Sequence, residues 1–538
     1  MNNHVNTQRR KLIKLAGTGA AATAALAAFP GLLNATTMRV GSHPTIDFNP
    51  DVEISLTGEV KYVSIFDGPQ TRVWKVLGKV LKGDKGVITN DDKSYLAPTI
   101  RLHKGQKVRI YLKNELPSST ILHWHGLHVP SKMDGNPMYA IDNGETFVYE
   151  FEILNRAGTY WYHAHTHSLT AKHVYSGLAG FFIVSDDEEQ ALKLPNAEYD
   201  IPLVIQDRNF DQQNQLKYSG GMMQRMHGFL GDQILVNGQP DFELPVATCA
   251  YRIRLLNGSN SRIYKLAWDD GSPMKVIATD GGLLEHAETL PYITLAPAER
   301  REIWVDFSNQ KIGAELTLRS QEFSSSGMGM MGGMGGRRGM MSGGMRGGRG
   351  SNMMGKQLQS GESFTVLKVR VSKKVSREDV LPKRLSKIKH LRLADAENPQ
   401  SPRRITMSMR HMSALLNGRS YKMNDIREDE IVPLNSLQLM EFDNGHHGMG
   451  MMAMPHPMHL HGEQFQVVKR EVRNKSSRGY SSVSQGFLDK GWKDTVLVMP
   501  GEKVTILKPF NDFSGIFMYH CHNLEHEDMG MMRDLLVK

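Results

Sequence analysis

Four pairs of histidines in the pattern His-x-His are the residues of this 538-residue chain with the most evident chemistry. Side chains alternate between the two faces of a β-strand, so residues i and i+2 point the same way and each pair presents two imidazoles together. A single pair is ordinarily a pair of core histidines, but four pairs in repeat-related positions indicate a polynuclear metal site. The eight histidines are His123, His125, His163, His165, His459, His461, His520 and His522.

A cysteine between two of these histidines points to copper. Cys521 faces away from His520 and His522 on its predicted strand, and the short peptide through it joins the two faces. Two imidazoles, one thiolate and a weak thioether form a blue copper site, whereas zinc keeps four strong ligands, often with Cys-x-x-Cys spacing. The candidate ligands are His456, Cys521, His526 and Met531. The other cysteine, Cys249, is expected to be a buried small hydrophobe and not a disulfide partner.

An internal repeat explains why the histidines come in matched sets. Tyr162-His163-Ala164-His165 follows a Gly-Glu pair at the same spacing as Tyr519-His520-Cys521-His522, and each copy has His-x-His-Gly upstream. The first copy lacks the blue-copper ligands. A protein with one site of electron entry and one shared cluster explains this loss, whereas a copper-storage protein does not. The aligned positions in that copy hold Thr120, Ala164, Leu169 and Val174.

The elements that must position these side chains are short strands. Alternating segments such as 99–103, 107–112 and 503–507 recur between turns rich in Gly, Pro and Asn, and no long amphipathic helix is found. Many short strands at regular spacing predict an all-β fold of Greek-key β-sandwiches. The chain length and the repeat predict three such domains, at residues 44–190, 197–372 and 400–538.

The N-terminus is typical of an export signal. Arg9-Arg10 precedes a mild apolar run, and Ala35 offers a small-residue cleavage site, so residues 1–35 are predicted to be a signal peptide for the Tat export machinery. We therefore expect a periplasmic protein, and no apolar run predicts stable membrane insertion. The net charge of +9 comes mainly from this leader and from a Met/Gly/Arg segment, and it gives no argument for nucleic-acid binding.

Seventeen of the 32 methionines of the chain lie in three clusters. Residues 328–354 are mostly Met, Gly and Arg inside the last predicted hairpin of the second domain, and this composition predicts a loosely ordered loop. A second cluster runs from His446 to Met458, and the third is Met222, Met223, Met226 and His227. Thioethers select Cu(I), so we expect additional labile Cu(I) at these segments; the alternative is flexible filler.

Together, these motifs resemble the four copper motifs of the multicopper oxidases. His-Trp-His-Gly, Tyr-His-Ala-His, His-Pro-x-His-x-His-Gly and His-Cys-His-x3-His-x4-Met are all present, and the match covers nearly the whole chain after the leader. Further similar strings begin at Asp280, Gly491 and Glu525. The chain resembles in particular the periplasmic cuprous oxidases of the copper-efflux type, which implies that the sandwiches are cupredoxin-like.

The resemblance implies four copper ions, each with its own ligands. The type 1 copper takes His456, Cys521, His526 and Met531. The type 2 copper takes His123 and His459. The type 3 pair takes His125, His163 and His522 on one ion, and His165, His461 and His520 on the other. Asp134 and Glu527 match the family's acidic residues that pass protons to the cluster, and reducing dioxygen to two waters consumes protons in a buried site.

The implied activity is oxidation of Cu(I), and of laccase-type reductants such as phenols, coupled to reduction of dioxygen to water. A general laccase, or an oxidase of Mn(II) or Fe(II), is the first alternative. A non-catalytic periplasmic copper-binding or scaffold protein is the second, but such relatives lose copper ligands and this chain keeps all twelve. A monomer is expected.

The sequence departs from the copper-efflux oxidases around the substrate. The Met-rich insert lies in the second domain instead of the third, and Met452 stands where those oxidases have an acidic residue. Met454 is the substrate ligand most readily carried over, and Asp443 or Glu441 is a candidate for the missing charge.

Overall fold

The computed structural model describes most of the chain after the leader, namely residues 41, 43–219, 221–325, 358–410, 413–445 and 454–538. The predicted signal peptide, the segment 328–354 and residues 446–452 of the second methionine cluster lie outside these residues. No helix in the described ranges is long and apolar enough to cross a membrane. Within the described residues the α-helices are α2 (Thr170–Ser176), α3 (Asp187–Ala191), α4 (Met222–His227), α5 (Arg478–Ser481) and α6 (Leu524–Asp528).

Two sheets form the first sandwich, and alternating aliphatic residues such as Ile54, Leu56 and Ile110 fill the space between them. One sheet has the order β2 (Thr71–Lys82), β1 (Val52–Val63), β5 (Lys107–Asn114), β7 (Thr146–Glu152). The other has the order β3 (Ile88–Thr89), β4 (Thr99–His103), β9 (Ala179–Ser185), β8 (Gly158–Ala164), β6 (Leu122–His125).

The second sandwich is built in the same way, and Cys249 is a free, buried thiol in its core. One sheet has the order β12 (Gln239–Pro240), β11 (Gln233–Val236), β10 (Asp200–Arg208), β14 (Ala250–Asn257), β19 (Arg300–Asp306), β16 (Met274–Thr279), β17 (Gly282–Leu290). The other has the order β13 (Glu243–Ala247), β21 (Phe364–Lys373), β20 (Glu315–Ser320), β15 (Tyr264–Trp268), β18 (Ile293–Leu295). Strands β20 and β21 pair antiparallel, so the segment 328–354 connects two neighbouring strands.

The third sandwich holds Cys521 in its core. One sheet has the order β23 (Ser413–Leu416), β22 (Arg403–Arg410), β25 (Ser436–Asp443), β29 (Glu502–Phe510), β27 (Gln466–Val472). The other has the order β24 (Ile431–Val432), β31 (Met532–Val537), β30 (Gly515–Cys521), β26 (His456–Leu460), β28 (Thr495–Val498). The predicted fold class of three cupredoxin-like β-sandwiches is confirmed.

The histidine pairs occupy equivalent strands of the first and third sandwiches. Strand β6 pairs antiparallel with β8 and places His123 opposite His163; β26 pairs antiparallel with β30 and places His459 opposite His520. Because residues i and i+2 share a face, each strand pair delivers its imidazoles to one side of its sheet. The repeat in the sequence is therefore also a repeat in the structure.

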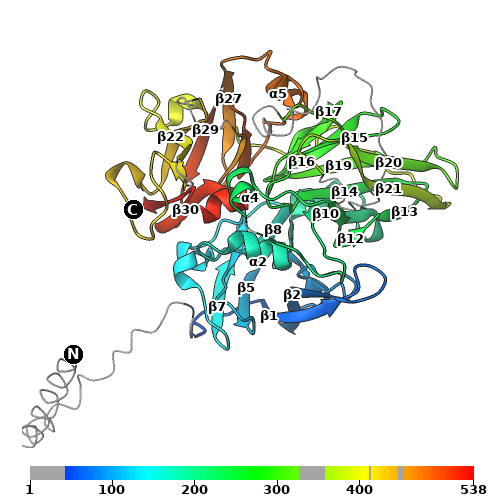
Figure 1. Cartoon of the computed structure of the whole chain (residues 1–538), viewed down its shortest axis with the longest axis horizontal. Coiled ribbons are helices and arrows are strands. Elements are labelled where there is room, and N and C mark those ends of the chain that lie inside the picture. Colours follow the sequence, from blue (N-terminus) through cyan, green and yellow to red (C-terminus); the bar gives the residue numbers. More distant parts are fainter. Residues whose placement is uncertain (1–40, 42, 220, 326–357, 411–412, 446–453) are drawn as a thin grey trace, which may run out of the picture.

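The three sandwiches meet where these strands end. Figure 1 shows the first sandwich in blue to cyan, the second in green and the third in yellow to red, with β8, β14 and β30 toward the centre. Strand β8 contacts β16, β17 and β19 of the second sandwich, and α2 contacts α6 of the third. Each sandwich therefore borders the region of the histidines.

Two glycines with the same backbone strain test how tightly the turn after β6 is packed. Gly135 and Gly144 have φ of +84° and +86°. A Cβ on Gly135 would lie 2.1 Å from the carbonyl oxygen of Leu122 and 2.6 Å from Cα of His123, whereas a Cβ on Gly144 meets nothing within 4 Å.

We predict that Gly144→Ala lowers the free energy of unfolding by about 1–2 kcal/mol, the cost of a left-handed alanine. Gly135→Ala has the same cost and also displaces β6, which adds about 1–3 kcal/mol. Urea unfolding of the metal-free variants measures both losses. Equal losses would show that the turn has room to adjust.

Candidate metal centre

Eight imidazoles from the first and third sandwiches converge in a buried space. Each of these residues is at most 2% exposed. Contacts of 3.2–3.4 Å between ring nitrogens divide them into one pair and two triplets. The pair is His123 and His459. One triplet is His125, His163 and His522, and the other is His165, His461 and His520. This grouping coincides with the one that the resemblance implies for the type 2 and type 3 coppers, whose presence stays a prediction.

Main-chain acceptors orient the two rings of the pair. Nδ1 of His123 donates to the carbonyl oxygen of Asp134 at 2.6 Å, and Nδ1 of His459 donates to that of Asp494 at 2.8 Å. Because a carbonyl oxygen only accepts, these two nitrogens carry the hydrogens. The Nε2 atoms, 3.4 Å apart, therefore present lone pairs to each other.

Carboxylates orient one ring in each triplet. Nδ1 of His461 donates to Oδ2 of Asp134 at 2.6 Å, so its Nε2 faces the triplet. His125 has the opposite arrangement, since its Nε2 donates to Oδ1 of Asp494 at 3.1 Å and its Nδ1 lies 3.3 Å from Nε2 of His163. Asp134 and Asp494 thus each hold one imidazole by the carboxylate and another by the main chain.

Facing lone pairs in a buried space repel one another, and protonation does not relieve the repulsion. Burial lowers the pKa of most of these rings well below the ordinary value, so they stay neutral, which is the form that binds metals. Cations between the facing nitrogens remove the conflict. The donor set therefore fits a metal cluster. The rings with this shift are His125, His163, His165, His459, His461 and His522.

A second donor set lies on the other face of β30. Sγ of Cys521 is 3.4 Å from Nδ1 of His456 and 3.7 Å from Nδ1 of His526, and all three residues are buried. Met531 is fully buried in the same core cluster as Cys521. Burial raises the pKa of the Cys521 thiol, so a thiolate here requires a bound cation. A soft thiolate with two imidazoles fits copper.

One peptide connects the two donor sets. Cys521 contributes its sulfur to the second set, while the adjacent His520 and His522 contribute their rings to the two triplets. The N–H of His522 also donates to the carbonyl oxygen of Pro457 at 2.6 Å, which ties β30 to β26. The two faces of a single strand therefore serve the two sites.

The two carboxylates predicted to handle protons lie beside the triplets. Asp134 binds His461, and burial raises the pKa of its carboxyl group. Oε2 of Glu527 lies 3.0 Å from Nδ1 of His520, and Oε1 lies 3.7 Å from Nε2 of His165. Burial opposes ionisation of Glu527, but the contact with His520 lowers its pKa to about 2. Both carboxylates therefore contact the imidazoles, and their role in handling protons stays a prediction.

Two contacts at the centre were not predicted from the sequence. The first is the contact of Asp494 with His125 and His459. Asp494 lies in the string that begins at Gly491, for which the sequence predicts no role. On the second donor set, Nε2 of His526 donates to the carbonyl oxygen of Met226 in α4, at 3.1 Å. A main-chain acceptor from another sandwich leaves no signal in composition or spacing.

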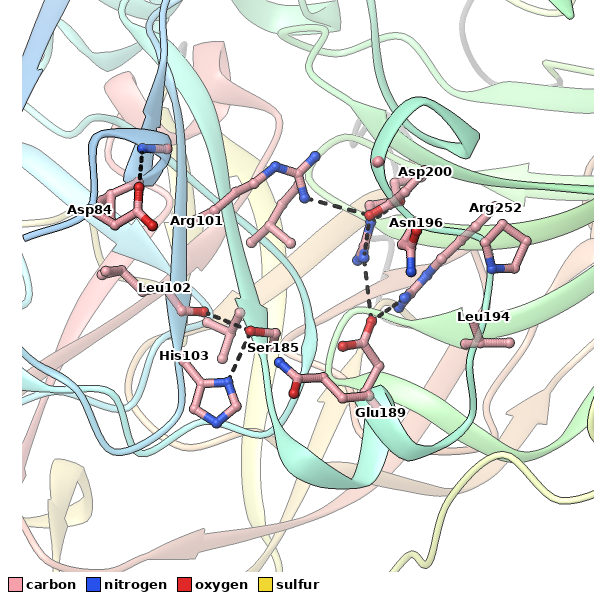
Figure 2. Close-up of a pocket in the computed structure, with 18 of the residues that line it drawn as sticks. Asp84, Arg101, Leu102, His103, Ser185, Glu189, Leu194, Asn196, Asp200 and Arg252 are labelled. Atoms are coloured by element: carbon pink, nitrogen blue, oxygen red, sulfur yellow. Dashed lines mark hydrogen bonds and ion pairs between the residues drawn. The ribbon is translucent and has the colours of Figure 1, made fainter.

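A cavity of about 620 Å³ lies in the seam between the first and second sandwiches, and none of the eight histidines lines it. Figure 2 shows Arg101 beside Asp200, and Glu189 beside Arg252. These charged groups are paired with one another, and the cavity is separate from the metal centre.

Comparisons with known proteins agree with this geometry. Family models described as multicopper oxidase match residues 74–189 and 396–538. The chain is 33% identical to the multicopper oxidase Mco of Staphylococcus haemolyticus over 82% of either chain. It is 29% identical to the laccase of Bacillus subtilis, over 87% of this chain and 91% of the laccase. The crystal structure of the multicopper oxidase McoA from Aquifex aeolicus superposes with a TM-score of 0.72 at 31% identity, covering 91% of this chain and 97% of McoA.

Replacing the sulfur of Cys521 tests the second donor set. We predict that Cys521→Ser abolishes the intense blue absorption and turnover, because a hydroxyl group does not supply the thiolate bond to copper. Visible spectroscopy and oxygen consumption measure the two effects. Cys249→Ser is the matched control, since Cys249 is equally buried but lies in another core. A blue band that survives in Cys521→Ser would refute the assignment.

Neutral isosteres of the two carboxylates test the proton role. Asp134→Asn and Glu527→Gln are expected to slow reoxidation by dioxygen, while the blue absorption still bleaches at the normal rate when a reductant is added. Stopped-flow spectroscopy separates the two half-reactions. Slower bleaching with normal reoxidation would reverse the assigned roles.

Proposed function

Because this chain belongs to the multicopper oxidase family, we propose that it couples oxidation of Cu(I), and of small reductants such as phenols, to reduction of dioxygen to water. The family membership makes it an oxidase with copper as its cofactor. The observation that carries the finer proposal is the division of eight imidazoles into one pair and two triplets, joined through Cys521 to a thiolate set.

We assign four coppers to these donors. Bound copper supplies one-electron chemistry at the thiolate set and four-electron reduction of dioxygen at the imidazoles. The thiolate set is His456, Cys521, His526 and Met531, with the type 2 ion at His123 and His459. The type 3 ions take His125, His163 and His522, and His165, His461 and His520. Cys521 bridges the sites through its main chain, while Asp134 and Glu527 hold protons beside the triplets.

The surroundings of the thiolate set favour a small soft cation as the electron donor. His526 is fully buried beneath α4, and His456 is only 2% exposed. On α4, Met222 and Met226 are four residues apart and share a face of the helix, and the side chain of Met222 is exposed. Thioethers of this kind capture Cu(I). The helix therefore supports delivery of Cu(I) close to His526.

A cavity of about 170 Å³ near the thiolate set supports an aromatic reductant as a second substrate. It is lined by Pro455, which precedes His456, and by Phe323 and Tyr480. Its apolar and aromatic walls suit a small phenol. Ser325 and Ser360 also line this cavity. These two residues lie on either side of the segment 328–354 in the sequence, so the segment connects to the described fold beside the cavity.

The carboxylates considered for a substrate copper site have other partners. Asp443 forms an ion pair with Arg404, and Glu441 lies 3.1 Å from Lys503. Met454 is fully buried in the core with Cys521. These contacts support Met222 and Met226, and not Asp443 or Glu441, as the first ligands that Cu(I) meets.

We also propose where the enzyme acts and in which oligomeric state. The twin-arginine leader and the soft-metal chemistry support a periplasmic enzyme, exported folded by the Tat machinery, that acts in copper tolerance. A monomer is the expected state. Fractionation and gel filtration of the native protein test these points.

Removing the segment 328–354 tests the preference for Cu(I) over phenols. The deletion leaves every proposed ligand in place, and a short turn can rejoin β20 and β21 because they are paired. We expect the apparent KM for Cu(I) to rise severalfold, because soft ligands are lost, while phenol oxidation stays the same or increases. Parallel steady-state kinetics with Cu(I), a phenol and Fe(II) measure this, with copper content as the control. Unchanged Cu(I) kinetics would mean that the segment takes no part in delivery.

A further inference from the structure

A buried cluster of ion pairs lies beside the imidazoles, where the second sandwich meets the other two. Three cations balance three carboxylates, and each residue is at most 3% exposed. Burying charges is costly unless they are paired in good geometry, so the arrangement of this cluster is tightly constrained. The second sandwich contributes Asp280, Glu299, Arg300 and Arg301, and the third contributes Lys493 and Asp494.

Arg300 forms the one pair in this cluster that reaches the imidazoles. Its Nη1 and Nη2 donate to Oδ1 and Oδ2 of Asp494 at 2.7 and 2.5 Å, a two-point contact that fixes the plane of the carboxylate. The guanidinium is itself held, because Nε donates to the carbonyl oxygen of Thr159 at 2.8 Å and Nη2 to that of Asp280 at 2.9 Å. Arg300 thus links all three sandwiches.

Asp494, held in place by Arg300, in turn orients two imidazole rings from different sandwiches. Its Oδ1 accepts from Nε2 of His125, and its carbonyl oxygen accepts from Nδ1 of His459. Oγ1 of Thr495 donates to the same Oδ1 at 2.9 Å and lies within 3.3 Å of both rings. As a result His125 turns Nδ1, and His459 turns Nε2, toward the other imidazoles.

We infer that Arg300 is a positioning residue of the imidazole cluster, which acts through Asp494 to orient His125 and His459. The second sandwich supplies none of the proposed ligands, yet by this contact it sets the direction of one ring in the pair and one ring in a triplet. Loss of outer hydrogen bonds to metal ligands, such as those that Asp494 makes, typically changes metal affinity by about 10–100-fold. The inference rests on the proposed assignment of His125 and His459 as copper ligands.

The test compares Arg300→Met with Arg254→Met. Arg254 is a matched control, since it is equally buried in the second sandwich and pairs with Asp200 and Glu302, but it does not touch Asp494. Arg300→Lys keeps the charge and loses the two-point contact, and it serves if the methionine variant does not fold. Copper content is followed during dialysis against a chelator, with the type 2 electron paramagnetic resonance signal and the blue absorption recorded in parallel.

We expect Arg300→Met to lose copper from the imidazole cluster at a chelator concentration about 10–100-fold lower than the native protein. The type 2 signal changes, and the blue absorption per type 1 copper does not. Arg300→Lys is expected to lose copper at a chelator concentration between those of Arg300→Met and the native protein. Arg254→Met retains copper as the native protein does. Melting of the metal-free variants separates lost stability from lost affinity.

Native copper retention and an unchanged type 2 signal in Arg300→Met and Arg300→Lys would overturn the inference and reduce Arg300 to a structural ion pair. Failure of the native protein to hold copper at the imidazoles is a different result. It would overturn the proposed function, and the inference would fall with it.

Discussion

Lone pairs of imidazole nitrogens that face one another across 3.2–3.4 Å are the constraint on which this structure depends. Neutral imidazoles do not pack this way for their own stability, because three of the contacts set two acceptors against each other: His123 with His459, His125 with His163, and His461 with His520. The arrangement persists because the opposite nitrogens of several rings are anchored to carboxylates and carbonyl oxygens, such as those of Asp134 and Asp494. The fold thus maintains unfavourable contacts between imidazole nitrogens, and a bound metal cation would remove the repulsion.

Strand geometry brings both sites into reach of each other. On β30 and the residue that follows it, the alternation of faces directs Cys521 away from His520 and His522, so the thiolate set and the imidazole cluster share one peptide. The same alternation on β6, and on β8 and β26 with the residue that follows each, supplies the remaining rings. The second sandwich has no His-x-His pairs. It is linked to the imidazole cluster through Arg300, which binds Asp494 of the third sandwich, and its helix α4 covers His526.

Features that arise from local patterns were predictable from the sequence, and those that arise from long-range packing were not. The His-x-His pairs and the place of Cys521 follow from a period of two, and the repeat related the two ligand-bearing sandwiches. The contact of His526 with Met226 joins residues 300 positions apart, and that of Arg300 with Asp494 joins residues 194 apart. Neither leaves a periodic signal, because the docking of separate sandwiches decides both. The sequence string around Asp494 resembles one of the family's, but it does not indicate that Arg300 is the partner of Asp494.

Anomalous diffraction at the copper edge from crystals of the copper-loaded protein tests the central claim most directly. The account predicts one peak among Cys521, His456 and His526, one peak between His123 and His459, and one peak within each of the two triplets. A single peak shared by all eight imidazoles, or copper bound only at methionines away from them, would contradict it.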